Sequence, residues 1–241
     1  MAADFRNSQK RFRRFLFLCF TEFLFEILNR SAIKTGLALL VAFFCCQSCG
    51  LADYGRDEDN KYVYIRIPDP SFQTYCLAHW DLNGDGRISR YEAQRVREMD
   101  CSSLGIFSMT GIEEFTALRR LDCSGNQIAS LDLTRSVYLE ELDCSDNQLI
   151  SLDLKGLRSL NRLYCRNNLL TLLDLGTQAA LSELRCGENR LVALDVRFCA
   201  TDMAEVNTLT TGNTDLTVIY KMRGQTIKNF QYDSWTQVQE W

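Results

Sequence analysis

The sequence predicts an α/β repeat fold, a solenoid of about six coils with short parallel strands and a helical cap at its N-terminal end. The first observation is a pattern, Leu-x-x-Leu-x-Cys-x-x-Asn-x-φ-x-x-Leu-x-φ with φ aliphatic, which recurs every 21 residues between residues 96 and 218. The second is an acidic twelve-residue loop just upstream. The third is composition, because 241 residues that are 46% hydrophobic, with only two prolines, can build one long core.

Residues 1–48 are predicted to be a targeting segment. A basic stretch at residues 29–34 is followed by a short apolar run at 37–44 and then by a Ser-Cys pair. This order is typical of a secretory signal. Its end resembles a bacterial lipoprotein cleavage site, which implies that Cys49 receives lipid and becomes the mature N-terminus.

Alternatives to this interpretation stay open. Cys45 or Cys46 could take the lipid instead, and a plain membrane anchor is disfavoured because the apolar run is too short to cross about 30 Å of hydrocarbon. Residues 1–28 carry a basic cluster and a second apolar run interrupted by two glutamates, and their role stays open.

Residues 49–61 are predicted to form a flexible acidic tether. A chain that begins at Cys49 carries 20 Lys and Arg against 28 Asp and Glu, a net charge of −8. Such an acidic domain is a poor nucleic-acid binder, because binding to phosphates relies on basic side chains.

Residues 62–99 are predicted to form the helical cap. Apolar and polar residues alternate from 63 to 67, which favours a short strand. Asp69 can then cap a helix that has Pro70 at its first position. The residues at helical spacing in it are Phe72, Tyr75, Cys76 and His79.

The loop at residues 81–92, Asp-Leu-Asn-Gly-Asp-Gly-Arg-Ile-Ser-Arg-Tyr-Glu, is the most specific chemical motif of the chain. It resembles the twelve-residue EF-hand, and the resemblance implies a calcium site. The implied ligands are Asp81, Asn83, Asp85, Arg87 through its carbonyl, Ser89 and Glu92. Gly86 permits the tight bend of such a loop.

The alternative for this loop is a capped acidic turn, since Ser89 and Glu92 also form a capping box for a helix predicted over Arg90–Met99. That alternative leaves the Asp-x-Asn-x-Asp spacing and Gly86 unexplained. EF-hands normally pair, and the sequence contains no second loop. We therefore expect modest affinity and a structural role for calcium.

Four clear copies of the repeat follow. Their Leu, Leu, Cys and Asn residues are Leu118, Leu121, Cys123 and Asn126; Leu139, Leu142, Cys144 and Asn147; Leu160, Leu163, Cys165 and Asn168; and Leu181, Leu184, Cys186 and Asn189. Degraded copies begin at Val96 and Met203. A coil of this length cannot bury its own apolar residues, so neighbouring coils must stack.

The repeat cysteines are predicted to be buried, reduced thiols. They would form a column with a spacing of about 4.8 Å, and parallel side chains at that spacing fit disulfide geometry poorly. The total of eleven cysteines therefore indicates mostly core packing and not a set of disulfides.

The pattern resembles the leucine-rich repeat family, and more narrowly its 21-residue bacterial variant with cysteine at the third leucine position, as in internalin-type surface proteins. The resemblance implies that each x-Leu-x-Cys-x segment is a short strand on a concave face. It also implies that the repeated asparagines bond backbone groups at the following turn and are structural. Residues 219–241 are predicted to form a C-terminal cap with Trp235 as its anchor.

Outward residues of the predicted strands form two columns. The first is Glu98, Arg120, Glu141, Arg162, Glu183 and Glu205, and the second is Asp100, Asp122, Asp143, Tyr164, Arg185 and Asn207. Tyrosine and arginine are favoured at binding hot spots. We therefore predict a contact patch for a partner, consisting of Arg162, Tyr164, Arg166 and Arg185.

These observations favour a non-enzymatic, lipid-anchored, extracytoplasmic binding module for a protein or glycan ligand, at the outer membrane or cell surface. A periplasmic or secreted location is the alternative. The rival function is an accessory subunit of a surface glycan-processing or proteolytic complex. An enzyme is disfavoured because no nucleophile and base fall together in the pattern, and His79 is the only histidine.

Overall fold

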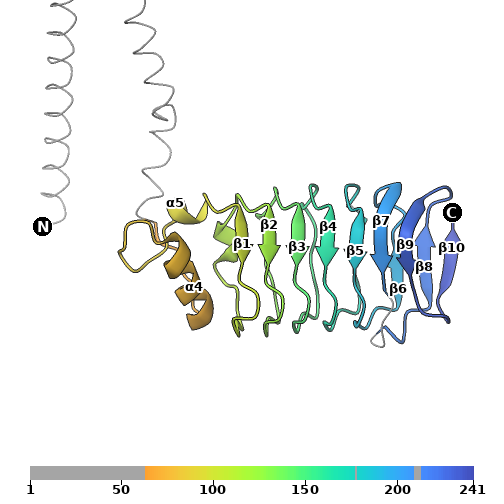
Figure 1. The fold of residues 1–241 in the computed structure, drawn as a ribbon, viewed down its shortest axis with the longest axis horizontal. Coiled ribbons are helices and arrows are strands. Elements are labelled where there is room, and N and C mark those ends of the chain that lie inside the picture. The colour runs from red at the N-terminus through yellow and green to blue at the C-terminus, as the bar shows by residue number, and fades with distance from the viewer. Residues whose placement is uncertain (1–62, 177, 209–212) are drawn as a thin grey trace, which may run out of the picture. The chain divides into compact units, whose positions relative to one another are not determined.

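The computed structural model describes residues 63–176, 178–208 and 213–241, all of which belong to the compact unit Gly55–Trp241 (Figure 1). The expected targeting segment, the tether and the lipidation site at Cys49 lie outside the described residues. Within the described ranges, no helix is long and apolar enough to cross a membrane.

The described residues form a solenoid of parallel strands, as predicted. Seven strands make one sheet in the order β1-β2-β3-β4-β5-β7-β9, and three make a second in the order β10-β8-β6 (Figure 1). Every strand pair in both sheets is parallel. The elements are α4 (Pro70–Trp80), α5 (Arg90–Ala93), β1 (Glu98–Asp100), the 3-10 helix η2 (Ile112–Glu114), β2 (Arg120–Asp122), β3 (Glu141–Asp143), β4 (Arg162–Tyr164), β5 (Glu183–Arg185), β6 (Ala193–Asp195), β7 (Asp202–Asn207), β8 (Val218–Lys221), β9 (Thr226–Gln231) and β10 (Gln237–Glu240).

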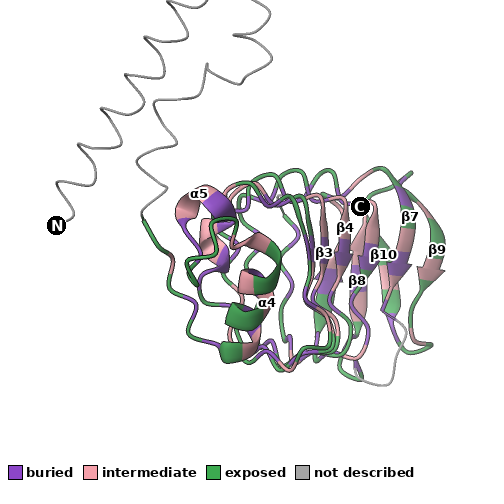
Figure 2. Ribbon diagram, turned by 60° about the vertical axis from the view of Figure 1, so that its left-hand side comes forward, coloured by how far each residue is buried: buried purple, intermediate pink, exposed green. Residues whose placement is uncertain are grey.

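The core is one continuous cluster of apolar residues, among which leucine is the most frequent. The middle residues of successive strands, Leu121, Leu142, Leu163 and Leu184, are in register and buried. Figure 2 shows the purple of buried residues along the strands of the stack. Burial of a leucine side chain contributes roughly 1.5–3 kcal/mol. Because each of these residues packs between its counterparts in the neighbouring coils, stacking supplies the burial that a single coil cannot.

The repeat cysteines lie inside this stack. Cys101, Cys123, Cys144, Cys165 and Cys186 are fully buried and free, which confirms the predicted column. Burial is the largest cause that raises the pKa of each thiol. The pKa of Cys186 rises to about 12. The column therefore consists of protonated, apolar-packed groups at neutral pH.

The repeat asparagines join neighbouring coils, as the resemblance implied. In Asn147, the side-chain oxygen accepts from the Ile128 N–H at 3.0 Å, and the amide nitrogen donates to the carbonyls of Cys123 and Cys144. Asn213 makes equivalent bonds to Leu191 and Cys186. The sequence pattern missed Asn213 because its coil is longer, although an asparagine ten residues after Met203 was the available signal.

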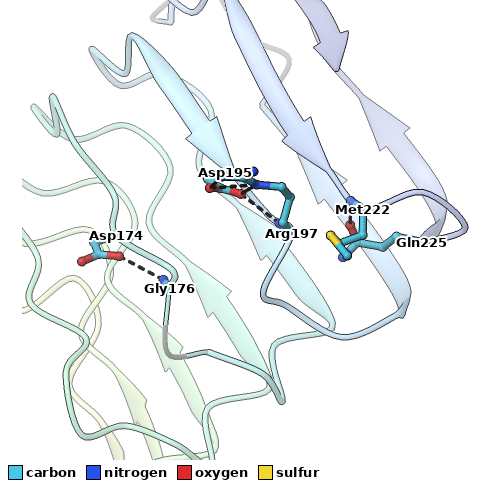
Figure 3. Close-up of polar contacts among 6 residues, drawn as sticks. All are labelled: Asp174, Gly176, Asp195, Arg197, Met222 and Gln225. Atoms are coloured by element: carbon cyan, nitrogen blue, oxygen red, sulfur yellow. Dashed lines mark hydrogen bonds and ion pairs between the residues drawn. The ribbon is translucent and has the colours of Figure 1, made fainter. Parts of the chain in front are cut away.

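A second ladder was not predicted from the sequence. In four successive coils an aspartate accepts from the backbone N–H two residues later, at 2.9–3.0 Å, and these aspartates recur with the 21-residue period. They are Asp132, Asp153, Asp174 and Asp195. Figure 3 shows the bond from Gly176 to Asp174 and the additional ion pair of Asp195 with Arg197. Near β8, the Met222 N–H donates to the side chain of Gln225.

Helix α4 covers the N-terminal end of the stack (Figure 1). Asp69 caps it as predicted, because one carboxylate oxygen accepts from the Ser71 and Phe72 N–H groups. The other oxygen accepts from the Phe107 and Ser108 N–H groups of the first coil. Asp69 therefore fastens the cap to the repeats.

Three expectations for the cap and the tail were wrong in detail. The helix predicted over Arg90–Met99 ends at Ala93, because Glu98–Asp100 is extended and pairs with β2 as the first rung of the sheet. The strand expected at 63–67 is reduced to one bridge, between Tyr64 and Ser89. Trp235 is 51% exposed and so is not a buried anchor, and β9 and β10 continue the two sheets at this end.

Candidate functional site

The outward residues of the seven-stranded sheet form the two predicted columns. Strand pairing places Glu98, Arg120, Glu141, Arg162, Glu183 and Glu205 opposite one another in turn. It does the same for Asp100, Asp122, Asp143, Tyr164, Arg185 and Asn207. We call this surface the sheet face. Its register follows from the 21-residue period, so the sequence alone was sufficient to find it.

Ion pairs connect neighbouring rungs of the first column. Glu141 lies between Arg120, at 3.0 Å, and Arg162, at 2.5 Å. The hydrogen bond that the Arg162 guanidinium donates to Glu141 is the largest cause that raises the pKa of Arg162. Exposed pairs of this kind each contribute about 0–1 kcal/mol, so they orient the side chains more than they stabilise the fold.

Tyr164 and Arg185 are adjacent at the centre of the second column. The Arg185 guanidinium lies over the Tyr164 ring and pairs with Glu183 at 3.2 Å and Glu205 at 3.1 Å. Burial raises the pKa of Tyr164 to about 12, and a hydrogen bond with Glu183 acts in the same direction. Tyr164 is therefore a neutral, oriented hydroxyl at neutral pH.

The predicted contact patch is thus brought together but is not strongly cationic. Arg166 pairs with Glu188 at 2.7 Å, so Arg162, Arg166 and Arg185 each have a carboxylate partner. Tyr164, Arg166 and Arg185 border one hollow of about 650 Å³. Its other lining residues are Ser124, Asp143, Ser145, Asp146, Gly187, Glu205 and Asn207.

The opposite end of the sheet face is acidic. A hollow of about 440 Å³ lies over the first three rungs and includes Asp100, Asp122 and Asp143. The serine two residues after each aspartate donates its N–H to the carboxylate, at 2.9–3.2 Å. Burial is the largest cause that raises the pKa of Asp143, and the charges of Asp122 and Asp146 add to it. The repeated Asp-Cys-Ser triplet was the available signal for this arrangement.

The EF-hand-like loop is folded around its own carboxylates. Asp81 accepts from the N–H groups of Asp85 and Gly86, and Asp85 accepts from the Arg87 N–H at 3.0 Å. Gly86 has φ of +75°, as the predicted bend requires, and Gly84 has φ of +68°. The side chains of residues 81, 83 and 85 therefore bond to one another and to the loop backbone, and Asp85 also accepts from the Tyr64 hydroxyl at 2.9 Å.

Glu92 serves the capping box of α5 and also reaches the start of the loop. Its carboxylate accepts from the N–H and hydroxyl of Ser89, at 2.8 and 2.7 Å, and from the Leu82 N–H at 3.0 Å. The chemistry of the expected ligands suits calcium, because all of them are oxygen donors and three are carboxylate groups. In the described part of the chain, however, no group of three or more His, Cys, Asp or Glu side chains is gathered closely enough to hold a metal ion.

His79 is exposed on α4 and contacts two aromatic residues of the same helix. Its Nδ1 lies 2.8 Å from the Tyr75 carbonyl, and its ring packs near Tyr75 and Trp80. The sheet face and His79 are thus formed by different elements of the fold.

The stacked strands, the buried thiols and the asparagine ladder define a leucine-rich repeat solenoid with a cysteine ladder. The solved functional domain of InlJ from Listeria monocytogenes, which includes a cysteine ladder, is similar, with 30% identity and a TM-score of 0.54. The similarity covers 69% of this chain and 38% of that chain. Internalin J of Listeria monocytogenes serotype 4b (strain F2365) is 35% identical over 70 residues, which is 29% of this chain and 8% of that protein.

Another solved internalin, InlF of strain 4b F2365, has 17% identity and a TM-score of 0.45, covering 68% of this chain and 64% of that chain. No family model matches the chain. This chain spans well under half of Internalin J and of its solved domain, so the likeness concerns the repeats and not the activity of the whole protein.

Proposed function

We propose that the chain is a non-enzymatic binding module that uses the sheet face to hold a protein ligand. The observation that carries this proposal is the hollow bordered by Tyr164, Arg166 and Arg185. Tyrosine and arginine dominate binding hot spots, and here their side chains are oriented before any partner arrives, which lowers the entropy lost on binding. The likeness to internalins supports an interaction or adhesion role.

The location and the cofactor belong to the same proposal. The order of basic, apolar and Ser-Cys segments in residues 29–49 supports lipidation of Cys49 and attachment at the outer membrane or cell surface. The ligand spacing of residues 81–92 supports one calcium ion, which would be held by Asp81, Asn83, Asp85, the Arg87 carbonyl, Ser89 and Glu92. Its role would be structural, at the cap.

A rival function is an accessory subunit of a glycan-processing or proteolytic complex at the surface. Both functions need a partner, so the decisive experiment identifies it. The full-length chain, immobilised in calcium, is used to capture partners from surface extracts, and a Tyr164→Ala, Arg185→Ala chain serves as the matched bait. A protein retained by the wild type alone supports the module. A hydrolase retained equally by both baits supports the rival.

The anchor is tested separately by mass spectrometry of the mature N-terminus. A lipid-modified Cys49 is expected. An unmodified chain that retains residues 29–48 would contradict the anchor without affecting the proposal for the sheet face.

A further inference from the structure

The backbone upstream of α4 pairs with the second half of the EF-hand-like loop. Tyr64 and Ser89 form an antiparallel bridge. Two hydrogen bonds flank the bridge, from the Ile65 N–H to the Ile88 carbonyl at 2.9 Å and from the Arg90 N–H to the Val63 carbonyl at 2.8 Å. Residues 63–65 therefore give the loop a paired edge, although they lie outside the loop itself.

The Tyr64 side chain extends this contact to two expected ligand positions. Its hydroxyl donates to Asp85 Oδ2 at 2.9 Å. The Arg87 guanidinium lies over its ring, 5.1 Å from the centroid. One residue thus touches both Asp85, whose carboxylate is expected to bind calcium, and Arg87, whose carbonyl is expected to do so.

The bond from Tyr64 does not use up the Asp85 carboxylate. Oδ2 also accepts from the Asn83 side chain at 3.0 Å, and Oδ1 accepts from the Arg87 N–H at 3.0 Å. A carboxylate offers about four acceptor positions, and three are occupied. Since Oδ1 keeps one position for a cation, Tyr64 orients the group and does not block it.

We propose that residues Val63–Ile65 take the place of a second calcium loop, with Tyr64 as a positioning residue for Asp85 and Arg87. This inference rests on the proposed calcium site. A loop that carries three carboxylates resists closure because like charges repel. A paired edge fixes part of the loop in advance, which reduces the ordering cost of binding. Cation binding in turn tightens the edge that residues 63–65 form with the loop.

Amide hydrogen exchange of the full-length chain tests the coupling directly. The probes are the Ile65 and Arg90 N–H groups, because each is a donor in the paired edge. Saturating calcium is expected to slow their exchange at least about tenfold relative to chelator, as a ligand that binds only the closed form requires. Calcium binding by calorimetry without any change in these two rates would overturn the coupling.

The same data separate the two proposals. If no binding heat is found, the calcium site fails, while the exchange rates in chelator still report on the paired edge. Rapid, unprotected exchange of both amides in chelator and in calcium would overturn the paired edge itself.

A conservative variant tests the role of the hydroxyl. Tyr64→Phe keeps the ring over which Arg87 lies and removes only the bond to Asp85, so calcium affinity is expected to fall about fivefold, the scale of one hydrogen bond. Tyr138→Phe is the matched control, because Tyr138 is 58% exposed on the repeats and far from the loop in sequence. A Tyr64→Phe chain that binds calcium as tightly as the wild type, or more tightly, would rule out the positioning role.

Discussion

The guanidinium carbon of Arg185 lies 5.1 Å from the centroid of the Tyr164 ring on the neighbouring strand. Such a contact contributes about 0.5–1 kcal/mol at an exposed site, and the ion pairs of Arg185 with Glu183 and Glu205 contribute about 0–1 kcal/mol each. The fold therefore depends little on these two side chains. Their orientation is more useful to a partner than to the core.

Replacement of both residues should accordingly separate binding from stability. The double variant Tyr164→Ala, Arg185→Ala is expected to bind the captured partner with at least about tenfold lower affinity. The reason is that truncation of a hot-spot residue typically costs more than 1 kcal/mol of binding free energy. The free energy of unfolding should fall by only about 1 kcal/mol. Surface plasmon resonance and urea unfolding provide the two readouts. Unchanged affinity would place the contact elsewhere on the solenoid.

The cysteine ladder should be inert while the protein is folded. Burial raises the thiol pKa values, and that of Cys186 is about 12, so very little nucleophilic thiolate exists at pH 8. Alkylation of Cys123, Cys144 and Cys165 by iodoacetamide is expected only after denaturant is added, as peptide mapping can show. A disulfide mapped between any two of these three residues would contradict the packing account.

The repeats were predictable because one period determines many contacts at once. Once Leu121 and Leu142 are assigned to equivalent positions, the burial of Cys123 and the bonds of Asn147 follow from stacking. Asn213 was not assigned to the repeat position of the other asparagines because its coil contains extra residues, and a fixed period cannot anticipate an insertion.

The cap was less predictable because local and tertiary preferences conflict there. The capping box of Ser89 and Glu92 starts a helix, as its sequence indicates. Pairing of β1 with β2 then overrides helical propensity from Glu98 onward, and sequence spacing alone does not show where one preference yields to the other. The pairing of Tyr64 with Ser89 is a long-range contact that no local pattern indicates.

Asp69 should be the most sensitive polar residue of the cap. Four backbone N–H groups bond its buried carboxylate, two from α4 and two from the first coil. Asp69→Ala leaves these donors without their partner, and we expect a loss of about 2–4 kcal/mol in the free energy of unfolding. Thermal and urea denaturation measure it. Asp233→Ala, near the other end of the solenoid, is the comparison variant.

The pH dependence of that contribution has a defined sign. Burial alone would raise the pKa of Asp69, but the bonds from Phe72, Phe107, Ser108 and Ser71 outweigh it and the pKa is lowered from 3.8. A group with a depressed folded pKa contributes stability that is complete above its unfolded pKa and is lost as pH falls through the folded value. Acid unfolding of the wild type below about pH 4 should therefore be steeper than that of Asp69→Asn.

Calcium binding should stabilise the whole repeat domain through the cap. Three contacts connect the loop to the stack: buried Ile88 lies in the core, Trp80 packs against Phe115 with ring centroids 5.6 Å apart, and Arg90 pairs with Glu114 at 2.9 Å. Because one contact lies just before the loop and the other two lie in its second half, order in the loop and order in the cap should be the same event.

The size of the effect follows from linkage. A ligand that binds only the folded state adds about 2.7 kcal/mol when its free concentration is 100 times the dissociation constant. For a domain of this size that corresponds to a rise of about 5–10 °C in the melting temperature. Magnesium should have little effect, since it demands a tighter octahedral shell.

The Glu92→Gln variant removes the negative charge of the expected calcium ligand while it keeps the helix-capping role of this residue. Glutamine at this position can still accept from the Ser89 N–H, so the capping box and α5 should persist while the bidentate ligand is lost. The melting temperature of Glu92→Gln, and of Asp81→Ala, should therefore no longer respond to calcium. Glu140→Gln removes a charge on the repeats, where Glu140 pairs with Arg119, and should keep the full response. A wild-type melting curve that is identical in chelator and in millimolar calcium would contradict stabilisation through the cap, and an absence of calcium heat in calorimetry would remove the site.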